Sequence, residues 1–493
     1  MESVIGYIVA FYAFAIGMRA ILNYFKGEKT LAEIADKRGF LDEEQSAAIR
    51  VILLLPMLRE QSEAVELLYR MDQLDYPPDR IVLVPITTEC EVAELGARID
   101  AAERIIDDLE NGGPGIASRW RYSRYFSGEL IDKMQTEWAS SSGDLRTKVR
   151  EMVAGPTTKD VVLNHLSKWN PRCQIVHLHY PKTSGNKAKQ MNFALATLKK
   201  TGVLRPDEAT YVGVYDADSA PDPYTLRVLS TYARENRPVA FQQYPIYLRN
   251  CGKLSRLMRN EAILQTAHSV CVEYPRQRRV NSAIQAGRNA GPTFTYCIGH
   301  GVFFRSDWIL EVGFPETAPV EDLPLGFMLS LGKKQIWTLP LFDVCTVPSS
   351  TNAFIRQTAT WFEAQLEFRE VIRSAYKHFD YVPTLRIARS LIEQTLTNAK
   401  WLLAGPCRVI AAIAAMVVGS WIGLLALLSA CLLEARLEWG VASHLVTRIS
   451  GGGAPSFDWL AVARTVLKSC GPCLVIVQRL CGLPPIRSKA ERV

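Results

Sequence analysis

The chain has 493 residues, and 57 Lys and Arg against 50 Asp and Glu give a formal net charge of +7. This length allows two or three domains, or one large catalytic unit with appendages. The positive balance is mild and is not gathered into runs of like charge, so no nucleic-acid partner is expected. Such a balance suits a chain that lies against anionic lipid or handles nucleotide diphosphates.

The chain begins with an apolar segment, Val4–Phe25, of 22 residues with one charge, Arg19. This segment is long enough to cross the hydrocarbon core of a bilayer. The start "MES" lacks the basic region of a signal peptide and no cleavage-like triplet follows, so we expect a retained anchor over residues 1–25. Lys26 and Lys29 follow, and the positive-inside rule then places the next segment in the cytoplasm, at the plasma (inner) membrane.

Strand and helix patterns alternate in the middle of the chain. "VILLLPMLRE" (51–60) and "RIVLVPITTE" (80–89) are apolar runs of buried-strand length, and a helical pattern follows each. Apolar strands separated by helices predict an α/β fold with a mostly parallel sheet and helices on both faces. Ligands of such sheets bind at the carboxyl ends of the strands.

Two aspartates stand at such a strand end in "YVGVYDADSAPDP" (211–223). Residues i and i+2 of a strand point to the same side, so Asp216 and Asp218 can present paired carboxylates to Mg²⁺ or Mn²⁺. The alternative is a solvated turn, because turns favour Asp, Pro and Ser. Taken alone, this stretch favours the turn.

The C-terminal part is again apolar. Val409–Leu433 has 25 residues without a charge, which predicts one crossing, or two short ones around Gly419-Ser420. The stretch 460–483 either spans the membrane or lies in the interface as an amphipathic helix. It contains "CGPC" (470–473), but a redox site needs a βαβ context, so we interpret this motif as coincidental. The 11 cysteines show no paired framework, and we expect reduced thiols.

Six motifs in order carry a family resemblance. They are "LPMLREQ", "LDYP" (74–77), "HYPKTSGNKAKQMNFAL" (179–195), "VYDADSAPDP", "GHGVFFR" (299–305) and "VEDLPLGFMLSLGKK" (320–334). Over roughly residues 48–365 the chain resembles the membrane-associated family 2 glycosyltransferases, which include cellulose and hyaluronan synthases and ceramide glucosyltransferases. The resemblance implies a GT-A (Rossmann-like) fold, a nucleotide-sugar donor, a divalent metal (Mg²⁺ or Mn²⁺) and inversion at the anomeric carbon.

The resemblance also implies roles for acidic residues. Asp218 would be a metal ligand, and Asp216 would lie by the nucleotide ribose or the metal. Glu321 and Asp322 resemble the acidic pair of the family, in which the aspartate is the general base that takes the proton of the acceptor hydroxyl. The alternative for Asp322 is an acid at a helix N-terminus, which is a common and stabilising placement.

Other positions match the family less directly. Lys187, in "GNKAKQMN", would lie beside the donor, and His300, between two glycines, would border the acceptor, although a solvated lysine and a structural histidine are the alternatives. "QTATW" (357–361) keeps the acceptor-side Gln357 and Trp361 of the family motif but has Thr360 where the family often has arginine. Arg356 is adjacent, but neighbouring helical residues point about 100° apart.

Two further polar clusters leave alternatives open. Where the family often has an aspartate for the nucleotide base, "TTECE" offers Glu89 or Glu91, and Glu89 is the residue we assign to the donor. His177 and His179 alternate with apolar residues. They resemble metal ligands, but the polar face of a strand explains them better.

The expected organisation has four parts: an anchor (1–25), a cytoplasmic GT-A domain (26–365), interfacial helices (366–400), and a C-terminal membrane region with a basic tail (401–493). The expected function is transfer of a sugar from a nucleotide-sugar to a lipid or glycan acceptor at the cytoplasmic membrane face, with membrane lipid as a further partner. The alternatives are a processive polysaccharide synthase and a non-catalytic membrane scaffold that keeps the fold.

Overall fold

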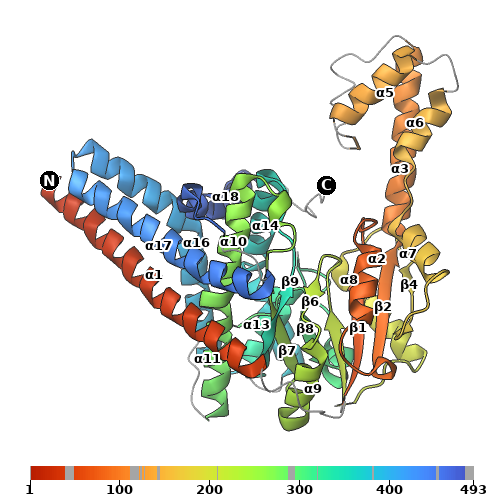
Figure 1. Cartoon of the computed structure of the whole chain (residues 1–493), viewed down its shortest axis with the longest axis horizontal. Helices are drawn as coiled ribbons and strands as arrows, with labels where there is room; N and C mark the ends of the chain where they lie inside the picture. The colour runs from red at the N-terminus through yellow and green to blue at the C-terminus, as the bar shows by residue number, and fades with distance from the viewer. Residues whose placement is uncertain are drawn as a thin grey trace.

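The structure is a computed structural model that describes residues 2–38, 49–111, 122, 125–126, 128–140, 145–207, 209–286, 295–318, 320–379, 382–450 and 455–483. A mixed α/β body lies at its centre, with long apolar helices on one side and a helical arm on the other (Figure 1). The basic tail after residue 483 and most of "SRWRYSRYF" (118–126) lie outside the described residues. The expected α/β class is confirmed.

One curled sheet forms the centre of the body. Its strands are β1 (Arg50–Pro56), β2 (Ile81–Thr88), β3 (Gln174–Ile175), β4 (Leu178–Tyr180), β5 (Thr210–Val214), β6 (Ala220–Pro221), β7 (Ala240–Ile246), β8 (Val302–Arg305) and β9 (Ile336–Val344). Their order is β3-β2-β1-β5-β8-β7-β9-β6, and β4 pairs with β2. β1 pairs in parallel with β2 and β5, and β7 with β9, whereas β8 runs antiparallel to both β5 and β7.

The apolar runs became central strands because both faces of the sheet are covered. On β1, Val51, Leu53 and Leu55 point to one side. Ile52 and Leu54 point to the other, as the two-residue period of a strand requires. The first side packs on α2 (Ala64–Asp72), α7 (Thr158–Leu166) and α9 (Thr225–Asn236). The second packs on α8 (Lys187–Lys200), α12 (Ser306–Val312), α13 (Asp322–Leu331) and α15 (Phe368–His378).

The antiparallel strand β8 decides where the polar residues gather. Val302 of β8 lies opposite Val214, the last residue of β5, and the amide of Gly301 donates to the carbonyl of Val214 at 2.8 Å. The segment that leads into β8 therefore lies at the same edge of the sheet as the segment that leaves β5. β9 also ends at this edge, since Val344 pairs with Ile246 and Asp343 with Pro221 of β6.

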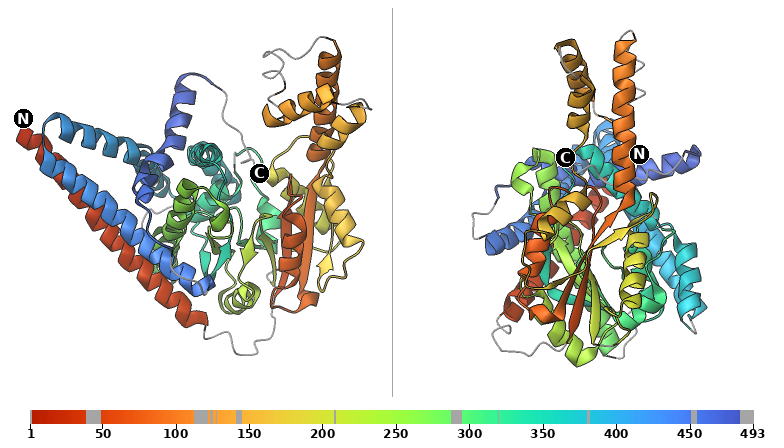
Figure 2. Two further views of the ribbon diagram at one scale, coloured as in Figure 1. Left: turned by 45° about the horizontal axis from the view of Figure 1, so that its top comes forward. Right: turned by 90° about the vertical axis from the view of Figure 1, so that its right-hand side faces the viewer.

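Long apolar helices lie beside the body. They are α1 (Glu2–Arg38), α16 (Thr384–Val417), α17 (Trp421–Ser450) and α18 (Arg464–Leu480). Figure 2 shows α1 and α17 side by side, with α16 diverging from them. Among the described residues, three helical stretches are long and apolar enough to cross a membrane: Val4–Ile34, Thr384–Val417 and Trp459–Leu480.

The predicted single crossing over Val409–Leu433 is wrong as a continuous helix. α16 ends at Val417, Gly419 has φ 68°, and α17 starts at Trp421. Glycine adopts this left-handed backbone readily, so it reverses the chain where the hydropathy pattern is unbroken. The break falls at the Gly419-Ser420 position that the sequence offered as the alternative.

Three more helices lie near these: α10 (Arg256–His268), α11 (Tyr274–Gln285) and α14 (Thr351–Ala364). A π-helical turn, Ser269–Glu273, joins α10 to α11, and single helical turns cover Pro78–Arg80, Cys251–Lys253 and Trp459–Ala463. "CGPC" lies within α18, where Gly471 packs against α14. Its context is thus a helix of the apolar bundle and not a βαβ unit.

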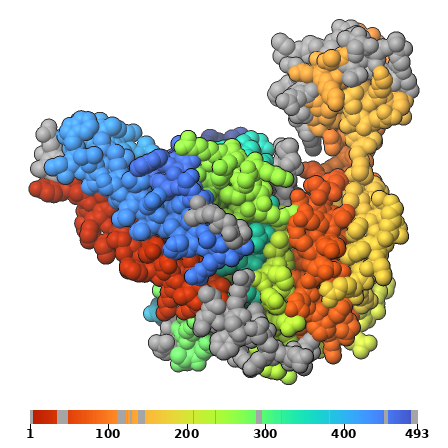
Figure 3. Space-filling view, in the orientation of Figure 1, coloured from red at the N-terminus to blue at the C-terminus, as the bar shows by residue number. Residues whose placement is uncertain are grey.

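A helical arm extends from the end of β2. It consists of α3 (Glu89–Glu110), α5 (Gly128–Ser140) and α6 (Leu145–Val153). Ala102, Ile106 and Met134 belong to its own small core. Figure 3 shows the arm standing clear of the body, so it forms a separate packing unit on the same chain.

Candidate active site

Lys187 lies where three distant parts of the chain meet. It is the first residue of α8, whose start is capped by the side chain of Asn186. Its Nζ atom lies 2.8 Å from Oδ1 of Asp216 and 3.1 Å from Oε1 of Glu321, and it donates to the carbonyl of Gly299 at 2.6 Å. The residues predicted from three separate motifs are therefore in one cluster.

The charge of Lys187 depends on these acids. Burial alone would lower the pKa of its ammonium, but Asp216 and Glu321 raise that pKa above the ordinary value. An opposite charge in contact favours the charged form. Lys187 is therefore a fixed cation among carboxylates at neutral pH.

Asp322 stands beside this cation at the start of α13. Its Oδ1 atom accepts a hydrogen bond from the amide of Leu323 at 2.8 Å. A Cβ atom on Gly299 would lie 3.2 Å from Oδ2 of Asp322 and 3.4 Å from Nζ of Lys187, so a side chain at this position would crowd both groups. Burial and the neighbouring Glu321 raise the pKa of Asp322 to about 7, against the opposing effect of Lys187. The carboxyl can thus gain and lose a proton near neutral pH.

Asp218 is held by the chain that follows β9. Its Oδ2 atom accepts from the amide of Thr346 at 3.1 Å and from the hydroxyl of Thr346 at 2.5 Å. Arg249, which follows β7, donates to the carbonyl of Asp218 at 3.0 Å and pairs with Glu63 at 2.5 Å. The loop that carries Asp216 and Asp218 is therefore fixed in place by side chains, which a solvated turn does not require.

His300 forms a pair that the sequence did not reveal. Its Nδ1 atom lies 2.8 Å from Oδ2 of Asp343, whose other oxygen accepts from the amide of Ala220 at 2.8 Å. Burial would lower the pKa of His300, but the hydrogen bond and charge of Asp343 raise it. Asp343 is fully buried. The sequence does contain a sign that Asp343 is unusual, because in "LFDVC" it is a single acid within an apolar strand.

The acids of this cluster suit a divalent cation. Asp216, Glu321 and Asp322 outnumber Lys187, Asp218 follows Asp216 by two residues, and carboxylate oxygens are ligands that Mg²⁺ and Mn²⁺ prefer. Within the described part of the chain, no group of three or more His, Cys, Asp and Glu side chains is arranged to hold a metal ion. A site with one or two protein carboxylates is nevertheless usual for a metal that also binds substrate phosphates.

Glu89 directly follows β2, whose carboxyl end lies at the same edge of the sheet as the end of β5. Its Oε2 atom lies 2.8 Å from Nε2 of His179, and the hydroxyl of Thr87 lies within 3.0 Å of both His177 and His179. These histidines are thus partnered along the strand ends, as the polar-face interpretation expects. Glu91 is buried and accepts from the amide of Thr158 at 2.8 Å, so its position is explained by capping α7.

Gln357 and Trp361 lie one turn apart on α14, and both are half-buried. Among the described residues, no polar contact joins either side chain to Lys187 or Asp322. Thr360, which replaces the family arginine, donates its hydroxyl to the carbonyl of Arg356 in its own helix at 3.0 Å. The acceptor-side role of Gln357 and Trp361 therefore stays a prediction.

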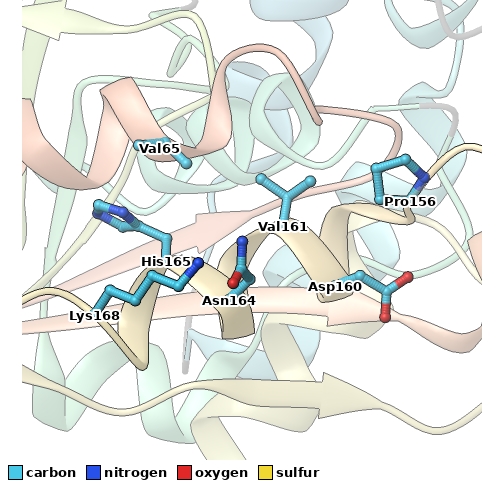
Figure 4. Close-up of a pocket in the computed structure, with 7 residues that line it drawn as sticks. All are labelled: Val65, Pro156, Asp160, Val161, Asn164, His165 and Lys168. Atoms are coloured by element: carbon cyan, nitrogen blue, oxygen red, sulfur yellow. The ribbon is translucent and has the colours of Figure 1, made fainter.

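A separate hollow of about 390 Å³ lies between α2 and α7 (Figure 4). Its lining residues are Val65, Pro156, Asp160, Val161, Asn164, His165 and Lys168. None of them belongs to the cluster around Lys187. This hollow is not the candidate active site.

No family model and no curated protein matches the chain. Among solved structures, it is similar to the mannosyltransferase PcManGT from Pyrobaculum calidifontis in complex with GDP-Man and Mn²⁺, with a TM-score of 0.46, 13% identity, and coverage of 97% of this chain and 99% of that chain. It is also similar to S. aureus TarS 1–349 in complex with UDP-GlcNAc, with a TM-score of 0.36, 12% identity, and coverage of 88% and 93%.

Proposed function

We propose that the chain is an inverting, metal-dependent glycosyltransferase of the GT-A fold, which moves a sugar from a nucleotide-sugar to a lipid or glycan acceptor at the cytoplasmic membrane face. The observation that carries this proposal is the contact of Lys187 with both Asp216 and Glu321. This contact joins Asp216, which is expected to serve the donor, and Glu321, which belongs to the acidic pair expected to serve the acceptor, through one cation.

Asp322 is the proposed general base. The acceptor hydroxyl oxygen attacks the anomeric carbon and forms the new glycosidic bond, while the bond from that carbon to the diphosphate breaks and its electron pair leaves with the nucleoside diphosphate. Asp322 takes the hydroxyl proton. A single displacement inverts the anomeric centre. The pKa of about 7 supports this role, because a base works best when its pKa is near the operating pH.

The departing group of this reaction needs cations near it. The leaving nucleoside diphosphate gains negative charge, and Lys187, as a cation among the acids of the site, would contribute to stabilising it. Asp216 and Asp218 would hold Mg²⁺ or Mn²⁺, which when bound lowers the charge of the diphosphate. Thr346 and Arg249 keep the Asp218 loop in place for this task.

The acceptor class follows from the apolar helices. Three stretches long enough to cross a membrane lie on the same chain as the candidate site, which favours an acceptor that is itself in the membrane. Lys26 and Lys29 after the first stretch favour a cytoplasmic catalytic domain, where nucleotide-sugars are made available.

The test uses the full chain, purified in detergent, and a panel of nucleotide-sugars. We expect release of nucleoside diphosphate that requires Mg²⁺ or Mn²⁺ with at least one donor. Asp218→Asn should abolish the metal enhancement of nucleoside diphosphate binding in calorimetry, because one carboxylate oxygen becomes an amide. Asp79→Asn is the control, since Asp79 is exposed and lies before β2. An Asp218→Asn variant with unchanged metal dependence would contradict the assigned ligand.

A further inference from the structure

The segment that leads into β8 belongs to no strand or helix. Residues 295–300 form this segment, and Thr295 and Cys297 in it are buried. Backbone groups that are shielded from water need hydrogen-bond partners, which side chains must supply where there is no sheet ladder or helix. The conformation of Gly299, which contacts Lys187, therefore depends on the side chains that hold this segment.

Gln242 of β7 binds the segment at two points. Its Oε1 atom accepts from the amide of Ile298 at 2.8 Å, and its Nε2 atom donates to the carbonyl of His300 at 3.0 Å. The same Nε2 atom donates to the carbonyl of Gln243 at 2.8 Å. A glutamine side chain has two N–H donors and one carbonyl oxygen, so these bonds use both donors and the oxygen. Gln242 is fully buried, and its orientation is set by these partners.

Gly299 lies between the two residues that Gln242 holds. Its carbonyl accepts from Nζ of Lys187 at 2.6 Å, and a Cβ atom added to it would lie 3.2 Å from Oδ2 of Asp322. The bonds of Gln242 thus fix, from both sides, a residue that lies beside the cation of the site and beside the proposed base.

The segment also rests on α13. A Cβ atom at Gly326 of that helix would collide with the backbone of Tyr296 and Cys297, so helix and segment are in close backbone contact. Asp322 stands about one turn before Gly326 on the same helix. The segment is therefore held both by β7, through Gln242, and by the helix that carries the proposed base.

An irregularity in β7 accompanies this arrangement. The pairing of β7 with β9 shifts register between Gln242 and Tyr244. Irregularities of this kind are over-represented next to active sites, where they re-aim a side chain. The neighbouring Gln243 accepts from the hydroxyl of Tyr215 at 2.6 Å and donates to the carbonyl of Phe342 at 3.0 Å. Gln242 therefore holds the entry to β8, whereas Gln243 holds the residue after β5 and the end of β9.

A glutamine with a structural role alone would also be buried and hydrogen-bonded. Gln277 of α11 has these properties, since it is buried and its Nε2 atom donates to the carbonyl of Ile336 at 2.9 Å. Ile336 is the first residue of β9, at the opposite end of that strand from Asp343. Gln277 thus matches Gln242 in burial and bonding but not in location, and it serves as the control.

We propose that Gln242 is a positioning residue of the transfer reaction. Through the amide of Ile298 and the carbonyl of His300, it sets the conformation of Gly299 between them. The carbonyl of Gly299 then meets Lys187, and the imidazole of His300 meets its carboxylate partner. The role in the reaction rests on the proposed function. Displacement of reacting groups by about 1 Å can lower a rate roughly a hundredfold, so loss of this bond pair should slow the transfer.

The first test compares Gln242→Met with Gln277→Met, because methionine has nearly the length of glutamine but no amide group. Both variants should lose thermal stability. The chain has 7 histidines, so NMR of the full chain with ¹³C-labelled histidine in detergent follows their titration, and His300→Gln assigns the signal of His300. In Gln242→Met the pKa of His300 should fall toward 6.5 by roughly half a pH unit or more, whereas Gln277→Met should leave it unchanged.

The second test is the rate of sugar transfer, which should be at least tenfold lower for Gln242→Met than for Gln277→Met. An unchanged His300 titration in Gln242→Met, or equal transfer rates of the two variants, would overturn the proposal. An unaltered chain that neither transfers sugar nor binds nucleoside diphosphate would contradict the proposed function instead, and the His300 titration would still report whether Gln242 fixes the segment. If Gln242→Met does not fold, Gln242→Asn takes its place, because an amide that is one methylene shorter cannot span Ile298 and His300 and should give the same two changes.

Discussion

The Nδ1 atom of His300 lies 2.8 Å from Oδ2 of the fully buried Asp343. The same carboxylate also receives the amide of Ala220, so it joins the segment before β8 to the end of β9 and to β6. A buried carboxylate is costly without a cation or hydrogen bonds. The charge of His300 therefore affects the stability of the edge of the sheet at which β6, β9 and the segment before β8 meet.

Asp343→Asn should destabilise the protein most strongly at acid pH. The pKa of His300 is raised above its ordinary value of 6.5, so the stabilisation is fully present below about pH 6.5 and is lost as the pH rises through the raised value. A charged hydrogen bond of this kind is worth about 1.5–3 kcal/mol. Thermal midpoints at about pH 6 and pH 9 measure this, and a gap between variant and unaltered chain that is the same at both pH values would contradict it.

Asp322→Asn should reduce sugar transfer by roughly a hundred- to ten-thousand-fold, because the amide cannot take the acceptor proton. Donor and metal affinity should change little, since Lys187, Asp216 and Asp218 remain. The measurement is the transfer rate on the purified variant, once a donor is known. Transfer at a near-normal rate would exclude Asp322 as the base and make Glu321 the next residue to test.

The same variant gives a second, independent result. The pKa of Asp322 is raised from 3.8 to about 7, so the folded state holds this proton more tightly than the unfolded state. Stability is therefore lost as the pH rises from about 4 to about 7. Asp322→Asn removes this loss of stability. The thermal midpoint of the variant minus that of the unaltered chain should therefore be larger at about pH 8 than at about pH 5. A simple helix-end acid predicts the opposite, a small loss of stability in the variant.

Lys187→Gln should weaken nucleoside diphosphate binding by at least tenfold, about 1.4 kcal/mol, and should also destabilise the fold. Removing the cation leaves Asp216 and Glu321 without their common partner, and breaking a buried ion pair costs about 3–5 kcal/mol, less here because Lys187 is 20% exposed. Lys189→Gln, in the same helical turn, is the matched control. Calorimetry gives the nucleoside diphosphate affinity of both variants, and thermal denaturation gives their stability. Equal affinities and equal thermal midpoints for the two variants would contradict the proposed role of Lys187.

Gly471→Leu should separate α18 from α14. A Cβ atom at Gly471 would lie 2.3 Å from the hydroxyl of Thr358 and 2.6 Å from the amide of Ala359, so any side chain forces the helices apart. Overpacking of this kind costs about 1–3 kcal/mol. Gly440→Ala in α17 is the control, because a Cβ atom there meets nothing within 4 Å. The thermal midpoint in detergent should fall for the first variant only; an unchanged midpoint for Gly471→Leu would refute the close packing.

The proposed orientation is tested by labelling Ser167→Cys, which lies at the exposed end of α7. The background replaces by serine the six cysteines that are not buried, which are Cys90, Cys251, Cys407, Cys470, Cys473 and Cys481. The introduced thiol should resist an impermeant maleimide in intact cells and react after lysis. Reaction in intact cells would reverse the topology, and the background without the new cysteine reports labelling of the buried thiols.

The sequence determined the features that depend on local pattern. The apolar runs at β1 and β2 predicted buried strands because a strand covered on both faces must be apolar at every position. The apolar stretches at both ends predicted helices of membrane-crossing length for the same kind of reason. Asp216, Asp218 and the pair Glu321 and Asp322 were visible as acids at strand and helix ends, where local geometry exposes them.

The tertiary structure decided which of these residues meet. Lys187 contacts the carbonyl of Gly299 as well as Asp216 because the segment before the antiparallel β8 returns to the edge where β5 ends, and no local period reports the pairing of strands that are distant in the sequence. The turn at Gly419 is another case, because hydropathy is the same on both sides of it. Asp343 is the clearest one. Its partner His300 lies on another strand's entry segment, and the low dielectric of the interior that makes their pairing necessary exists only after the chain has folded around them.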